Sequence, residues 1–137
     1  MANWLFKEEP ETYSFADLER DGSTTWSGVT NALAQKHLRA VKKGDCVFFY
    51  ATGKEKAVVG VMEVLTAPAP DPTDDTGKCV AVTVKPVRRL ATPVTLAAIK
   101  ADKAFARWEL VKQARLSVMP VPDELWARIE KMATGAE

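Results

Sequence analysis

The 137-residue sequence has few of the residue types from which metal and redox sites are built. It contains two cysteines and one histidine, which are too few for a zinc site or a disulfide framework. Cys46 and Cys79 each stand in an apolar, strand-like segment, so we expect buried, reduced thiols. The sequence therefore predicts a protein without a metal ion or another cofactor.

The sequence also lacks any apolar run that approaches the roughly 20 residues of a membrane-spanning helix. Its first segment becomes acidic at Glu8 and Glu9, where a secretory signal peptide is apolar. We therefore expect a cytoplasmic protein with no membrane partner. No repeat or low-complexity segment divides the chain, so residues 1–137 are expected to form a single domain, with a monomer as the favoured state.

The usual motifs of catalysis and nucleotide binding are absent. Gly53-Lys54 lacks the rest of a phosphate-binding loop, and Ser27-Gly28 lacks the Gly-x-Ser-x-Gly pattern of a nucleophile elbow. His37 falls near apolar positions of a predicted helix, where a packed or half-exposed histidine is more common than a catalytic base. These absences predict a protein that is not an enzyme.

Charge is distributed unevenly along the chain, although the net charge is only +1. Residues 1–25 carry two basic and six acidic groups, whereas residues 76–118 carry nine basic and two acidic groups. A folded domain with this pattern can present a basic and an acidic face, as nucleic-acid-binding proteins do. Solvated lysines account for the same pattern, so charge alone does not identify a partner.

The hydrophobic pattern predicts an α+β fold, a small curled sheet or barrel bordered by short helices. Strands are expected at 3–7, 45–50, 57–65, 80–87 and 116–121. Helices are expected at 14–20, from 31 to a terminating Gly44, at 96–99 after a Thr95 cap, at 104–111 and from 122. Ser14-x-x-Asp17 has the form of a capping box.

Trp26 occupies an unusual place in this pattern, between a polar turn and a predicted helix. We therefore place it in a connection, where side chains carry function more often than in regular elements. The alternative is a tryptophan that closes one end of the core. Aromatic and polar groups also gather near other predicted strand ends, at Lys7, Tyr50 and Arg115. Aromatic faces stack on nucleobases, so these groups suit a nucleic-acid ligand.

Several spaced motifs resemble the EVE domain family, and together they run almost from end to end of the chain. The opening motif comprises Trp4, Leu5, Lys7, Glu9 and Pro10. The most telling motif is the loop with Trp26, Gly28, Val29 and Asn31. Further matches are Tyr13-Ser14, Asp17-Leu18, Leu38-Arg39, Gly44-Asp45, Phe49-Tyr50, 58–60, Pro70-Asp71-x-Thr73, Leu96, Ile99-Lys100, Leu110-Val111, 115–118, Pro120-Val121 and Trp126.

This resemblance implies a PUA-like fold, a small bent β-barrel surrounded by short helices and related to YTH domains. It also implies a reader that holds a modified, flipped-out base in an aromatic-lined pocket, with modified cytosine in DNA favoured. Trp26 would stack on the base, and Ser27, Gly28 and Asn31 would contact its edge. Lys7 and Glu9 would form the pocket floor. The resemblance adds four more site residues: Val29, Tyr50, and Arg115 with Ser117 near the phosphate.

Two other functions remain compatible with the sequence. A reader of methylated RNA, like the YTH relatives, differs in its contact with the sugar hydroxyl. A small enzyme acting on modified nucleosides or nucleotides would use Glu9 or Lys7 for proton transfer, within hydrogen-bond reach of the reacting atom.

Overall fold

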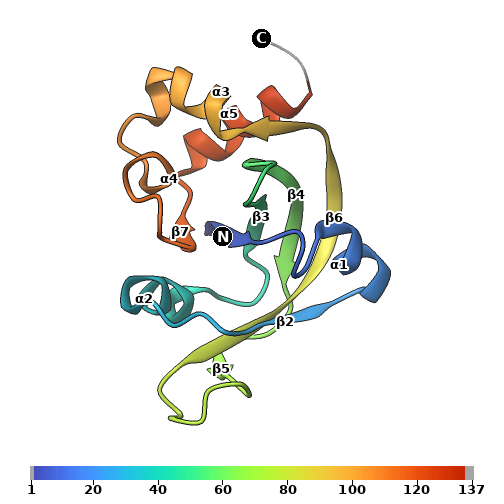
Figure 1. Cartoon of the computed structure of the whole chain (residues 1–137), viewed down its shortest axis with the longest axis vertical. Coiled ribbons are helices and arrows are strands. Elements are labelled where there is room, and N and C mark those ends of the chain that lie inside the picture. The colour runs from blue at the N-terminus through green and yellow to red at the C-terminus, as the bar shows by residue number, and fades with distance from the viewer. Residues whose placement is uncertain (1, 135–137) are drawn as a thin grey trace.

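A curled mixed β-sheet forms the centre of the computed structural model, which describes residues 2–134 (Figure 1). The strand order is β2-β6-β4-β3-β1-β7, and β5 pairs separately with β6. β1 and β3 are parallel, whereas the other paired strands are antiparallel. The strands are β1 (Asn3–Glu8), β2 (Thr24–Trp26), β3 (Cys46–Ala51), β4 (Ala57–Val64), β5 (Ala69–Pro70), β6 (Val80–Thr95) and β7 (Val118–Pro120).

Short helices surround this sheet, as expected for a small bent barrel. Figure 1 shows α3, α4 and α5 gathered toward one end of the barrel, while α2 lies beside β7 and α1 beside β6. The helical elements are α1 (Phe15–Asp21), α2 (Ala32–Ala40), α3 (Leu96–Ala101), the 3-10 turn η1 (Lys103–Phe105), α4 (Glu109–Lys112) and α5 (Asp123–Ala133). The architecture confirms the α+β class and the curled half-barrel. Within residues 2–134, no helix has the length and apolar character to cross a membrane.

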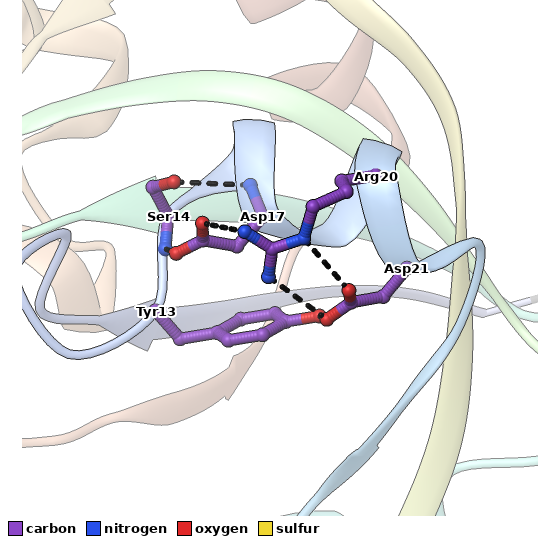
Figure 2. Close-up of polar contacts among 5 residues, drawn as sticks. All are labelled: Tyr13, Ser14, Asp17, Arg20 and Asp21. Carbon is purple, nitrogen blue, oxygen red and sulfur yellow. Dashed lines mark hydrogen bonds and ion pairs between the residues drawn. The ribbon is translucent and has the colours of Figure 1, made fainter.

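The capping box at the start of α1 is confirmed. Ser14 Oγ accepts from the Asp17 amide at 3.1 Å, and the Asp17 carboxylate accepts from the Ser14 amide at 2.9 Å. Figure 2 shows the Arg20 guanidinium between the carboxylates of Asp17 and Asp21, and it forms an ion pair with each of them. These contacts satisfy the helix start locally, while the side chain of Phe15 is buried in the core.

β6 is longer than predicted, because it continues to Thr95 instead of ending at Val87. Pro86 lies within the strand, although proline cannot donate a ladder hydrogen bond. The register with β4 shifts between Val61 and Met62, opposite Pro86, so the strand passes the proline at an irregularity. The same long strand is visible along one side of the barrel in Figure 1 and leads directly into α3.

Two predicted helices also differ from the observed ones. α2 ends at Ala40, with Val41 extended as its C-cap, so the prediction that Gly44 ends it was wrong. The helix predicted at 104–111 is interrupted at Trp108, which is extended and separates η1 from α4. The Trp108 indole donates to the Pro120 carbonyl at 2.9 Å, and this buried tertiary contact outweighs the local helical pattern.

Both faces of β3 are covered, and each face packs against different aromatic side chains. Phe49 packs edge-on against Trp26 and against Phe15, with ring centroids 5.5 and 5.6 Å apart. On the other face, Phe48 stacks on Trp126 of α5 at 3.6 Å. Because Trp126 of α5 covers the face of Phe48, neither face of β3 is solvated.

Both cysteines are free, and both are half-buried rather than buried as expected. Burial raises the pKa of the Cys46 and Cys79 thiols, which favours the protonated form. His37 is half-buried, as expected, with its ring 6.3 Å from that of Trp4.

Candidate functional site

Trp26 lies in the core at the end of a strand, and its predicted position in a connection was wrong. Thr25 and Trp26 pair with Thr83 and Val82 of β6, which makes the tripeptide before the loop a short edge strand. The Trp26 side chain is only 4% exposed, and its ring lies 5.4 Å from that of Phe6. The core alternative therefore describes the conformation of Trp26 in this structure.

The loop that follows Trp26, residues 27–31, has a defined geometry. Gly28 has φ +78°, a left-handed conformation that favours glycine, and its amide donates to Asp71 Oδ2 at 2.8 Å. The Asn31 side-chain oxygen accepts from the Ala34 amide at 3.0 Å and caps α2. Asn31 is exposed, and its side-chain NH2 is a hydrogen-bond donor.

Two buried residues that the site prediction omitted hold this loop. Asp71 is 4% exposed and bonds Gly28 as described, and Gln35 is 3% exposed. Gln35 Nε2 donates to the Val29 carbonyl at 2.7 Å, and Gln35 Oε1 accepts from the Val80 amide at 2.9 Å. The Asp-Pro-Thr sequence after Pro70 has the composition of a side-chain-stabilised turn, which could have indicated Asp71. Gln35 gave no comparable signal, because glutamine is common on exposed helix faces.

Lys7 connects the end of β1 with the segment before β7. Its Nζ donates to the Ala114 carbonyl at 2.9 Å and lies 5.5 Å from the centroid of the Tyr50 ring. The Lys7 amide donates to the Ser117 carbonyl at 2.9 Å. Burial lowers the pKa of Lys7 and raises the pKa of Tyr50. The structure thus brings Lys7 close to Tyr50 and to the backbone of Ser117.

A pocket of about 410 Å³ lies between the start of α2 and the segment before β7. We call it the Asn31–Arg115 pocket; it is lined by Asn31, Leu33, Gln113, Ala114, Arg115 and Leu116. Its size is within the range of small-ligand sites, and it combines apolar walls with a few polar groups. Lys7 contacts the wall of this pocket through its hydrogen bond to the carbonyl of Ala114. Asn31 and Arg115, far apart in the sequence, therefore share one cavity.

Glu9 is directed elsewhere. Its carboxylate accepts from the Thr52 hydroxyl at 3.2 Å, in the turn between β3 and β4, and it is not among the residues that line the pocket. Neither is Trp26, for the reason given above. Within residues 2–134, no cluster of three or more histidine, cysteine, aspartate or glutamate side chains could hold a metal ion.

The fold and this site define a class of protein, a small curled half-barrel with a polar pocket beside an aromatic core. The EVE domain family model matches residues 2–132 of the chain. The chain therefore belongs to the EVE domain family, and the resemblance inferred from the sequence motifs is confirmed.

Solved structures share the fold over nearly the whole chain. The NMR structure of Rpa0253 from Rhodopseudomonas palustris is 41% identical and has a TM-score of 0.93, covering 100% of this chain and 96% of that chain. The crystal structure of the human THYN1 protein in complex with 5-methylcytosine containing DNA is 28% identical. Its TM-score is 0.89, and the match covers 97% of this chain and 98% of that chain.

A curated relative gives the same result from sequence. Thymocyte nuclear protein 1 of Homo sapiens is 31% identical over an alignment of 157 residues. The alignment covers 90% of this chain and 70% of that protein. The similarity therefore extends across the fold and the site described above.

Proposed function

We propose that this chain binds DNA that contains a modified cytosine and that it performs no chemistry on the base. The observation that carries the proposal is the shared pocket of Asn31 and Arg115, which places an amide donor beside a cation. The fold supports it, because the human relative of the same fold was crystallised with 5-methylcytosine containing DNA.

In this proposal an extruded base enters the Asn31–Arg115 pocket. Leu33 and Leu116 provide apolar walls against the base, and the Asn31 side-chain NH2 donates to an acceptor on its edge. Arg115 is exposed at the rim, where its guanidinium can bond a backbone phosphate. Trp26 then acts from behind the loop, as a core residue that positions Ser27 and Gly28.

The contacts of the two proton-transfer candidates favour binding over catalysis. Lys7 Nζ is bonded to the Ala114 carbonyl, and Glu9 is bonded to the Thr52 hydroxyl. A general base must be within hydrogen-bond reach of a proton on the substrate, and neither group faces the pocket in this arrangement.

A binding titration tests the proposal. Labelled single- and double-stranded oligonucleotides would carry cytosine, 5-methylcytosine, 5-hydroxymethylcytosine or N6-methyladenine at one position, with matching RNA as competitor. We expect about tenfold or tighter binding of a modified cytosine than of cytosine, which is the discrimination one good base contact provides. Equal affinities across the panel would refute the proposal, and preference for methylated RNA would favour the RNA reader instead.

Replacing Arg115 by alanine should lower the affinity for every DNA in that panel by a similar factor, because a phosphate contact does not distinguish between bases. The slope of log K against log salt concentration should also become shallower, by about one for double-stranded DNA and by about 0.7 for single strands. Arg107→Ala is the matched control, since Arg107 is exposed and does not line the pocket. An unchanged slope for Arg115→Ala, or an equal change in the control, would remove Arg115 from the DNA contact.

A further inference from the structure

Asp71 makes an unusual set of contacts for a buried carboxylate. It lies between β5 and β6, is 4% exposed, and accepts from three donors. Its Oδ2 accepts from the Gly28 amide at 2.8 Å, and its Oδ1 accepts from both the amide and the hydroxyl of Thr73 at 2.7 Å. The Asp71 amide donates to the Cys79 carbonyl at 2.9 Å, which anchors the aspartate in its own loop.

The charge of Asp71 is stabilised by these donors. Burial alone would raise the pKa of Asp71, but the hydrogen bonds from Thr73 and Gly28 outweigh burial and lower it. No lysine, arginine or histidine within residues 2–134 forms an ion pair with it. The carboxylate is therefore ionised at neutral pH, and it accepts one of its charge-assisted hydrogen bonds from the amide of Gly28, 43 positions away.

That bond fixes the middle of the loop at 27–31. The loop is held at its start by the pairing of Trp26 in β2 and at its end by the Asn31 cap of α2. Between them, Gln35 holds the Val29 carbonyl, and Asp71 holds the Gly28 amide. Asp71 is the anchor that comes from a separate loop, so it sets where the peptide at Gly28 lies relative to the Asn31–Arg115 pocket.

We infer that Asp71 is a positioning residue for base binding: by holding Gly28 it fixes the loop at 27–31, whose last residue, Asn31, lines the pocket. The inference rests on the proposed function and extends it to a loop outside the pocket. A preorganised wall loses less conformational entropy on binding and distinguishes similar ligands better than a mobile one. The role of Asp71 is therefore discrimination between bases, in addition to affinity.

The test compares Asp71→Asn with Asp75→Asn. Asparagine keeps the shape of Asp71 but has one acceptor oxygen, so it cannot accept from both Gly28 and Thr73. Asp75 is the matched control, because it lies in the same loop and its side chain is exposed. The first readout needs no DNA: the hydrogen-exchange rate of the Gly28 amide, followed by NMR. The second is the affinity ratio between 5-methylcytosine and cytosine oligonucleotides.

We expect Asp71→Asn to accelerate Gly28 exchange about tenfold or more and to bring the affinity ratio close to one. Asp75→Asn should leave both values as in the wild type. Thr73→Val, which removes only the hydroxyl bond, should act in the same direction as Asp71→Asn but more weakly, and it serves if Asp71→Asn does not fold.

The possible failures are distinguishable. Unchanged Gly28 exchange in Asp71→Asn, or an equal effect of Asp75→Asn, would overturn the inference. Faster exchange with an unchanged affinity ratio would also overturn it, because Asp71 would then stabilise the loop without affecting recognition. A wild-type protein that does not distinguish the two bases would instead refute the proposed function, while the exchange rates would still decide whether Asp71 fixes the loop.

Discussion

Replacing Trp26 by alanine is expected to lower the free energy of unfolding by about 3–5 kcal/mol, the usual cost of truncating a buried aromatic side chain. The Trp26 ring is 4% exposed and packs between the rings of Phe6 and Phe49. Removal leaves a cavity between β1, β2 and β3, and the surrounding strands cannot close over it without losing their own pairing. Chemical denaturation followed by circular dichroism measures the change.

The matched variant is Trp26→Phe, which keeps an aromatic ring in the same place. It should cost about 1–2 kcal/mol, since it removes less volume and conserves the edge-to-face contact with Phe49. This folded variant, and not the alanine, is the one in which DNA binding should be measured. A wild-type unfolding midpoint for Trp26→Ala would contradict the packing and restore an exposed role for this side chain.

The sequence predicts well those features that depend on neighbouring residues. The caps at Ser14 and Thr95 were each identifiable from a short polar side chain ahead of a helical pattern. The strands at β1, β3 and β4 were likewise visible as apolar, β-branched or aromatic runs. The family motifs then gave the fold, because they recur in order along nearly the whole chain.

The position of Trp26 could not be derived in this way. β2 is three residues long and exists because β6 lies beside it, pairing Trp26 with Val82. A segment this short has no periodicity of its own, so a glycine and two polar neighbours made it resemble a connection. The distinction between a core and a pocket tryptophan depended on a partner strand more than 50 residues later.

The polar contacts of the site were hidden for the same reason. Lys7 donates to the carbonyl of Ala114, which lies 107 positions away in the sequence. Gln35 bonds both the carbonyl and the amide of Val80, which lies 45 positions away. Local sequence patterns carry no information about such pairs, since ordinary lysines and glutamines occur on any exposed surface. The resemblance supplied Lys7 as a site residue and included Asp71 in a matched motif without a role, whereas Gln35 had no signal; the roles of Asp71 and Gln35 follow from their hydrogen bonds.

Gly60→Ala is expected to destabilise the protein by about 1–3 kcal/mol, although alanine normally stabilises an extended position that glycine occupies. A Cβ at Gly60 would lie 2.4 Å from Cε1 and 2.5 Å from Cζ of the Phe15 ring. Phe15 is 3% exposed and packs edge-on against Phe49, so its ring has little room to retreat. The added methyl group must therefore displace the ring or distort β4 at the irregular register beside Val58.

A double-mutant cycle with Phe15→Leu isolates that contact. Leucine lacks the ring atoms closest to Gly60, so Gly60→Ala should cost much less in the Phe15→Leu background than in the wild type. Because Phe49 joins Phe15 to Trp26, the displaced ring should also alter the tryptophan fluorescence of the folded Gly60→Ala protein. An equal cost in both backgrounds would show that the strand itself requires glycine at this position. A smaller cost in the leucine background would instead show that Gly60 allows α1 to approach the sheet closely enough to pack Phe15 against the rings that support the loop at 27–31.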